Sequence, residues 1–234
     1  MEQSYKTTAV LIKKRDWRES DLLFSFYAEK FGRVEAVAVG AKKILSKLSG
    51  HLSLGGLVEI DFIKGKNFYK LTHAYQLQKP EITDWQDLIF WSGAVEILLK
   101  GTPLEEPNAF VWRLLGWYRK QLGSTENFGE KSLLRSLFAI KFLQTAGYKL
   151  IVDKCPVCEK SLNNSSRIDF NAGGFICSEC GTKNVASEIF TLIKQLQESP
   201  GTGALWSKKD EQALAHFSKQ YAEYYLGCEL ISWR

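Results

Sequence analysis

Two Cys-x-x-Cys pairs, separated by 18 residues, constrain the fold of this 234-residue chain more than any other feature. Cys155 and Cys158 form the first pair, and Cys177 and Cys180 form the second. This spacing is typical of tetrahedral Zn²⁺ sites, in which each short turn directs two thiolates at one ion. Two redox-active thiol pairs are the alternative, but no thioredoxin-like βαβ pattern surrounds the cysteines. Because four thiolates fill the coordination shell, we expect one structural Zn²⁺ per chain.

The segment around these cysteines is locally acidic, since it carries Asp153, Glu159, Asp169 and Glu179. It is therefore a poor candidate for gripping phosphates, and we expect it to support the fold. The fifth cysteine, Cys228, stands apart among leucines, and we expect it to behave as a small apolar core residue.

The first 80 residues indicate five short strands, rich in β-branched and aromatic residues and separated by turn residues. The expected strands cover residues 7–14, 22–29, 33–40, 57–64 and 68–78. Val58, Ile60 and Phe62 alternate with more polar neighbours, which predicts one buried face. Five strands in this length fit a small closed barrel, with an OB-fold as the obvious candidate. A basic stretch at 41–56 interrupts the strands where an OB-fold often carries a helix or a long loop.

After Pro80 the apolar residues recur at helical spacing. The expected helices cover residues 82–101, 106–122, 130–147, 187–197 and 208–230. Asp84 is the expected N-cap of the first helix, and Gly101 is the expected residue just beyond its end. The acidic pair Glu105 and Glu106 is expected at the start of the second helix, where the helix dipole favours negative charge.

These elements predict an α+β multidomain protein: an N-terminal OB-fold β-barrel followed by an α-helical domain with an inserted four-cysteine zinc lobe. The barrel is expected at residues 1–80. The helical domain is expected at 81–150 and 184–234, and the zinc-binding lobe at 151–183.

The net charge of +5 is unevenly distributed. Residues 1–80 hold 14 Lys and Arg against 8 Asp and Glu, whereas 81–150 hold 8 against 8 and 151–234 hold 9 against 10. The positive excess therefore lies in the expected barrel, which favours a polyanionic partner such as nucleic acid. A solvated basic surface without a partner is the alternative.

No catalytic motif accompanies this basic part. The chain has three histidines, none in a recognisable motif, and neither a Walker A loop nor a G-x-S-x-G turn. Asp16, Glu19 and Asp21 are the only carboxylates that suggest a divalent-metal cluster, and their setting resembles a charged turn. We therefore expect a protein that is not an enzyme. Two alternatives stay open: an OB-fold and zinc protein that binds RNA or processes nucleic acid with a metal, and a pure protein-interaction scaffold.

The order of these features resembles the RecO family of bacterial recombination mediators over nearly the whole chain. The matching segments are AVLIKKRDWRESDLLFSFYAEKFGRVEAVAVGAKK at 9–43, SKLSGHL at 46–52, LLRSLFAIKFLQTAGYKLIVDKCPVCEK at 133–160 and GGFICSEC at 173–180. The resemblance implies an OB-fold, a helical domain and a zinc lobe. It also implies binding of single- and double-stranded DNA, annealing of complementary strands, and work with RecR, single-stranded-DNA-binding protein and, indirectly, RecA.

An OB-fold binds single strands by cationic side chains combined with aromatic stacking. The candidate DNA contacts are Lys13, Lys14, Arg15, Trp17, Arg18, Arg33, Lys42, Lys43, Lys47, Lys64, Lys66 and Lys70, with Phe68 and Tyr69 as further stacking candidates. Lys42 and Lys43 have no acidic residue within six positions, so we expect no charge pairing with their neighbours in the sequence and expect both to contact phosphates. The candidate cations for the acidic tail of single-stranded-DNA-binding protein are Arg113, Arg119, Lys120 and Arg135.

The chain shows no apolar stretch of membrane-spanning length, and its first residues have no continuous apolar segment, so we expect no signal peptide. Its odd cysteine count indicates a reducing compartment. We expect a cytoplasmic, nucleoid-associated protein.

Overall fold

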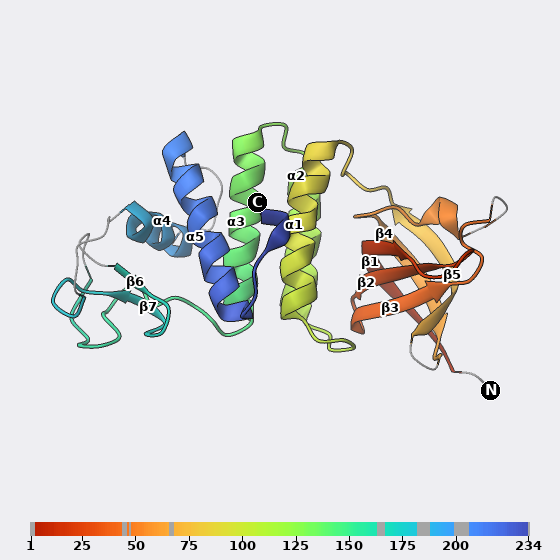
Figure 1. Ribbon diagram of the computed structural model, residues 1–234, viewed down its shortest axis with the longest axis horizontal. Helices are drawn as coiled ribbons and strands as arrows, with labels where there is room; N and C mark the ends of the chain where they lie inside the picture. The colour runs from red at the N-terminus through yellow and green to blue at the C-terminus, as the bar shows by residue number, and fades with distance from the viewer. Residues whose placement is uncertain are drawn as a thin grey trace. The chain divides into compact units, whose positions relative to one another are not determined.

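The computed structural model describes residues 3–43, 46, 48–65, 68–162, 167–181, 188–198 and 206–233 (Figure 1). Contacts within the chain divide it into two compact units, Met1–Glu126 and Asn127–Arg234. Among the described residues, the first unit holds a five-stranded sheet and two α-helices, and the second holds three α-helices and a small two-stranded sheet. The predicted order, a strand-rich N-terminal part followed by helices, is confirmed.

The strands of the first unit form a closed ring. They are β1 (Ser4–Asp16), β2 (Leu22–Ala28), β3 (Gly32–Ala38), β4 (Leu57–Ile63) and β5 (Tyr69–Gln78). The hydrogen-bonded order is β1-β2-β3-β5-β4, and β4 pairs again with β1. All pairs are antiparallel except β3 with β5. Ring closure satisfies backbone groups that an open edge would leave unpaired.

The barrel core follows the alternation predicted for β4. Val58, Ile60 and Phe62 are fully buried, whereas the residues between them are half-buried. The ring of Phe62 packs against Tyr69 and Phe31, with centroids 4.7 and 5.4 Å apart. Burial of each large apolar side chain contributes about 1.5–3 kcal/mol, so this inward face dominates the stability of the barrel.

The edge of β3 is continued by a segment that lies far away in the sequence. Leu104 forms a parallel bridge with Arg33, and the Glu105 N–H donates to the Arg33 carbonyl over 2.9 Å. Gly32 permits this contact, because a Cβ there would lie 2.1 Å from the Glu106 carbonyl oxygen. The segment before the second helix therefore belongs to the wall of the barrel.

Two helices complete the first unit: α1 (Trp85–Gly101) and α2 (Ala109–Gly123). Asp84 caps α1 as predicted, in a capping box. The expected start of α2 at residue 106 is wrong, because the Asn108 side chain caps the helix by accepting from two backbone N–H groups. Glu105 therefore lies outside the helix, at the barrel.

Gly101 is the last residue of α1, not the residue just beyond its end as expected. Thr102 closes the helix in an extended conformation, and both its backbone N–H and its hydroxyl donate to the Leu98 carbonyl. A hydroxyl thus satisfies the final turn, and a left-handed glycine is not required.

The second unit contains α3 (Phe128–Thr145), β6 (Arg167–Asp169), β7 (Gly174–Ile176), α4 (Glu188–Glu198) and α5 (Lys208–Leu226). Short 3₁₀ turns, η1 (Ser49–His51) and η2 (Ile231–Trp233), lie in the first and second units respectively. Helices α3 and α5 pack along each other (Figure 1). Gly227, with φ +65°, ends α5 in the left-handed region that favours glycine. In the described part of the chain, no helix is long and apolar enough to cross a membrane.

Candidate metal centre and nucleic-acid interface

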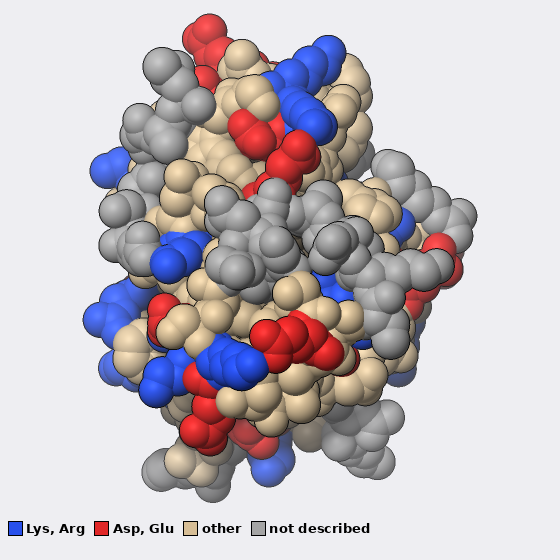
Figure 2. Space-filling model, turned by 90° about the vertical axis from the view of Figure 1, so that its left-hand side faces the viewer, with Lys and Arg blue, Asp and Glu red and all other residues tan. Residues whose placement is uncertain are grey.

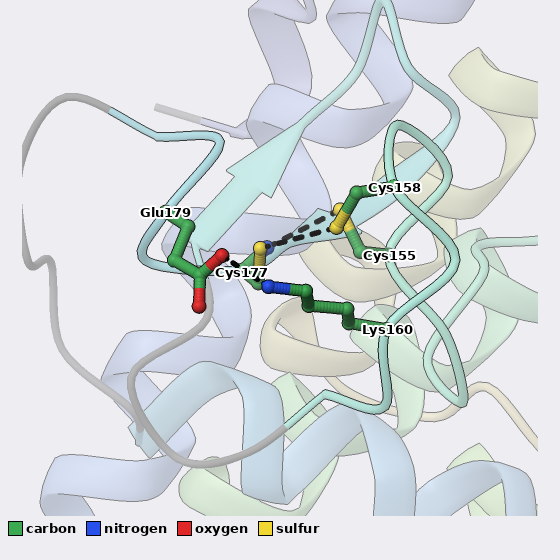
Figure 3. Close-up of polar contacts among 5 residues, drawn as sticks. All are labelled: Cys155, Cys158, Lys160, Cys177 and Glu179. Carbon is green, nitrogen blue, oxygen red and sulfur yellow. Dashed lines mark hydrogen bonds and ion pairs between the residues drawn. The ribbon is translucent and has the colours of Figure 1, made fainter.

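Four cysteine sulfurs converge in the second unit. Figure 3 shows those of Cys155, Cys158 and Cys177. The Sγ atoms of Cys155, Cys158, Cys177 and Cys180 all lie within 4.8 Å of one another, and those of Cys158 and Cys177 are 3.5 Å apart. Four sulfurs held about 2.3 Å from one Zn²⁺ lie about 3.8 Å apart, so the cluster has nearly the size of a tetrahedral site. Within the described ranges, this is the one cluster of metal-ligating side chains.

Each cysteine pair lies on a tight turn. In the first turn the Glu159 N–H donates to the Cys155 carbonyl over 2.8 Å. In the second, the N–H groups of Cys180 and Gly181 both donate to the Cys177 carbonyl, over 3.2 and 3.1 Å. The hairpin of β6 and β7 lies between the two cysteine pairs in the sequence and reverses the chain, so that the second turn lies next to the first.

The protonation of the cluster is uneven. Burial opposes ionisation of the Cys155 thiol, but the backbone N–H groups of Cys177, Cys158 and Val157 together lower its pKa to about 6. The neighbouring sulfurs of Cys158 and Cys177 raise the pKa of Cys180 to about 12. Four thiolates this close repel one another, so a dication is needed before all four can ionise.

Aromatic side chains attach this lobe to α5. The ring of Phe170, between β6 and β7, lies 5.2–6.2 Å from the rings of Phe217, Tyr221, Tyr224 and Tyr225. The Tyr225 hydroxyl also donates to the Phe170 carbonyl over 2.9 Å. Any loosening of the cysteine lobe therefore disturbs the packing of a long helix.

The side of the molecule where Figure 1 places β6, β7 and α4 carries interspersed charges of both signs (Figure 2). Two cations of the second unit are engaged in ion pairs: Lys160 pairs with Glu179 at 2.5 Å, and Lys209 pairs with Glu188 at 2.6 Å. This mixture agrees with a supporting role for the lobe, because a phosphate-binding surface needs an excess of one sign.

In the first unit, a loop clasp joins the turn between β1 and β2 to the end of β3. The buried Asp21 carboxylate accepts from the Gly40 N–H over 2.8 Å, and the Ser20 carbonyl accepts from the Lys42 N–H over 3.0 Å. Gly40 has φ +68°, which the turn requires. The clasp thus brings the acidic turn at Asp21 and the glycine turn at Gly40 together in space, although they are 19 positions apart in the sequence.

Lys42 has no acidic partner near it in the sequence, as expected, but it is paired with a distant one. Its Nζ lies 2.8 Å from an Asp16 carboxylate oxygen and donates to the Arg18 carbonyl over 3.3 Å. The acidic partner is 26 positions away in sequence, so a search of the neighbouring residues missed it. Lys43 is exposed and has no ion-pair partner among the described residues.

One aromatic pair joins two loops of the barrel. The Trp17 ring, 39% exposed, lies edge-on to the Phe68 ring with centroids 4.8 Å apart. Trp17 follows β1 and Phe68 precedes β5, so the pair connects the β1–β2 and β4–β5 loops. Tyr69, the third stacking candidate, packs instead against Phe62 in the barrel core.

Most predicted cationic contacts are exposed on the first unit. Those without an ion-pair partner among the described residues are Lys13, Lys14, Arg18, Lys43, Lys64 and Lys70. Arg15 lies 3.8 Å from Glu35, a long ion pair. The half-buried Arg33 donates to the Leu99 carbonyl near the end of α1. Lys47 and Lys66 lie outside the described residues.

The four cations predicted for the acidic tail of single-stranded-DNA-binding protein differ in their exposure. Arg119 and Arg135 are buried, and the Arg135 guanidinium lies 4.1 Å from the ring centre of Trp233. Arg113 lies over the Phe110 ring at 4.8 Å, and Lys120 is exposed. This corrects the expectation for Arg119 and Arg135, because burial removes both from the surface.

The three carboxylates considered for catalysis are also not assembled into a metal site. Asp16 is paired with Lys42, and Asp21 is buried against the Gly40 N–H. Glu19 is exposed between them. The turn that carries these carboxylates is part of the loop clasp, in which it is hydrogen-bonded to the end of β3.

Two family models together match nearly the whole chain. The family model described as "Recombination protein O N terminal" matches residues 1–79, and "Recombination protein O C terminal" matches residues 82–234. A "DNA repair protein RecO" of Clostridium acetobutylicum is 26% identical over 209 residues, covering 84% of this chain and 81% of that protein. Its counterpart in Clostridium perfringens is 31% identical over 178 residues, covering 73% and 70%. The chain therefore belongs to the Recombination protein O family.

Proposed function

We propose that this protein is a DNA repair and recombination mediator that binds single- and double-stranded DNA and anneals complementary strands. With RecR, it would help to load RecA on DNA covered by single-stranded-DNA-binding protein. Family membership and the names of its relatives support the DNA repair and recombination role. The observation that carries the DNA-binding part is the Trp17–Phe68 pair among unpaired cations.

The barrel is proposed to be an OB-fold. Its five strands close in the order β1-β2-β3-β5-β4, and the loops that meet at Trp17 and Phe68 are the two that OB-folds use for oligonucleotides. Exposed aromatic rings stack on bases while cations follow the phosphates, which gives binding with little sequence preference.

Annealing requires no catalytic step on this proposal. Cationic side chains neutralise the phosphates of two strands, so the strands can approach without their mutual repulsion. The mediator would need neither a nucleotide nor a general base, and we assign it no enzymatic activity.

The four cysteines are proposed to hold one structural Zn²⁺. Their sulfur spacing and uneven protonation suit a dication with four thiolate ligands. The ion would fix the two turns and, through Phe170, the docking of the lobe on α5.

The test measures binding of a fluorescent single strand by anisotropy over a range of salt concentrations. We expect salt-sensitive binding that Trp17→Ala weakens by about 1–3 kcal/mol, the value of one base–aromatic stack. Trp85→Ala is the control, because Trp85 is 65% exposed on α1, outside the two loops. Equal effects of both changes, or binding that ignores salt, would refute the proposed interface.

Two further assays address the wider function. Annealing of strands coated with single-stranded-DNA-binding protein, with and without RecR, tests the mediator role. Incubation of DNA with Mg²⁺ or Mn²⁺ tests the nuclease alternative, and cleavage there would contradict the absence of a catalytic role.

A further inference from the structure

A cavity of about 120 Å³ opens in the first unit where β3 meets β5. Its lining residues are Glu35, Lys64, Gly65, Phe68, Tyr69, Leu104 and Glu105. It is similar in size to a cavity of about 150 Å³ that holds a single six-membered aromatic ring. The pairing of β3 with β5 covers only two residue pairs, and this leaves room for a hollow beside it.

The cavity wall is completed by the segment before α2. Glu105 is held by the hydrogen bond of its N–H to the Arg33 carbonyl, over 2.9 Å, and it adopts φ +61°. Leu104 forms a β-bridge with Arg33, and the absence of a side chain at Gly32 leaves room for the Glu106 carbonyl oxygen. The backbone of Glu105 is thus held beside β3, and its exposed carboxylate lies within hydrogen-bonding reach of the Tyr69 hydroxyl.

The chemistry of the lining selects the kind of ligand. Phe68, Tyr69 and Leu104 supply flat or apolar surface, and the Glu35 and Glu105 carboxylates supply hydrogen-bond acceptors. The donors in the lining are the Lys64 ammonium and the Tyr69 hydroxyl, which lies within hydrogen-bonding reach of Glu105. Glu35 is partly neutralised by Arg15 at 3.8 Å, but Glu105 has no ion-pair partner among the described residues. The two carboxylates of the lining outnumber its one cation, Lys64, so the cavity disfavours phosphate and suits a flat ring that carries N–H donors.

Phe68 links this cavity to the interface already described. One side of its ring meets Trp17, and Phe68 also lines the cavity. A single strand that follows Lys64 and stacks on Trp17 therefore passes the mouth of the cavity. A base turned inward would meet Glu105 with its hydrogen-bonding edge.

We propose that the cavity receives one base of a bound single strand and favours cytosine over uracil or thymine, with the Glu105 carboxylate accepting from the exocyclic amino group. This inference rests on the proposed function. Uracil presents a carbonyl oxygen at the same ring position, which would face a carboxylate acceptor without a proton between them. The phosphates stay outside, on the cations, so general binding does not depend on the cavity.

The test compares oligo(dC) with oligo(dU) of equal length by competition anisotropy, at a mildly alkaline pH where cytosine is unprotonated. A homopolymer always offers the cavity the same base. The two rings differ at C4, which carries an amino group in cytosine and a carbonyl oxygen in uracil, and at N3, which carries a hydrogen only in uracil. We expect oligo(dC) to bind about fivefold more tightly, the low end for one base contact because the cavity opens to solvent.

Glu105→Gln separates the contact from the charge. A glutamine amide can donate to the uracil carbonyl, so the dC/dU ratio should fall to about one, with uracil gaining more than cytosine. Glu106→Gln removes the same charge one residue away, outside the cavity lining, and should leave the ratio unchanged.

Each outcome decides between the two proposals. A ratio of one in the unchanged protein, with Trp17-dependent binding intact, overturns the cavity inference and leaves the proposed function standing. A dC/dU ratio that Glu105→Gln leaves unchanged also overturns the inference, even if the substitution alters the affinities for both oligonucleotides by the same factor. Failure to bind either oligonucleotide refutes the proposed function itself.

Discussion

Replacement of Asp16 by Asn should strengthen single-strand binding by freeing Lys42. In the structure the Lys42 ammonium is 2.8 Å from the Asp16 carboxylate, so the two charges largely cancel at the loop clasp. Asp16 is 81% exposed in its side chain and Lys42 is 32% exposed, which makes this a surface pair. Its loss should cost the fold at most about 1 kcal/mol.

The size of the gain follows from counterion release. One additional phosphate contact on a single strand makes the slope of log K against log[salt] steeper by about 0.7. At about 0.1 M monovalent salt this term corresponds to an affinity about fivefold higher, because 0.1 raised to the power −0.7 is about 5. Lys43→Gln should do the opposite and make the slope shallower by about 0.7, since Lys43 is unpaired among the described residues.

A double-mutant cycle on Asp16 and Lys42, measured by anisotropy at several salt concentrations, separates the two causes of tighter binding. If Asp16→Asn acts by releasing Lys42, the steeper slope should disappear in the Lys42→Gln background. If it acts only by removing a negative charge, the gain should persist there. An unchanged slope in Asp16→Asn would show that Lys42 does not reach the phosphates, and the reasoning would fail.

Three further results are expected. Cys155→Ser should remove the zinc and lower the melting temperature of the second unit, whereas Cys228→Ser should keep the zinc, as metal analysis and calorimetry can show. Addition of Zn²⁺ at neutral pH should release at least two protons per chain, because the pKa values of Cys158 and Cys180 are raised. Below about pH 6 the Cys155 thiol is protonated too, so the zinc affinity should fall more steeply as the pH is lowered further. Asp21→Ala should destabilise the first unit by about 1–3 kcal/mol by leaving the Gly40 N–H unsatisfied, and Glu19→Ala in the same turn should change the denaturation midpoint little.

The features that could be predicted from the sequence are those that depend on residues only a few positions apart. The alternation in β4 and the cap at Asp84 depend on residues two to three positions apart, and both are confirmed. The grouping of the four cysteines depends on a strongly restrictive chemical pattern, and the structure places their sulfurs together. In these cases local geometry allows few alternatives, so one sequence is sufficient.

The features that were missed depend on contacts between distant segments. Lys42 meets Asp16 across the clasp, and Arg33 donates to Leu99, which lies 66 positions away. Glu105 was assigned to a helix start because acidic residues favour that position, yet a pairing with β3 holds it at the barrel. Helix propensity is a weak preference that such tertiary contacts override.

These distant contacts also change what the basic charge of the first unit can do. Nine of the candidate cations lie in the described part of the chain, and three of them, Arg15, Arg33 and Lys42, already have partners within the fold. The remaining six can each neutralise one phosphate, which limits their joint contribution to the salt slope to about 4, from about 0.7 per contact. The net charge of a segment thus overestimates the electrostatic contribution to its DNA affinity. Cations that are already paired within the fold release no counterions when a strand binds.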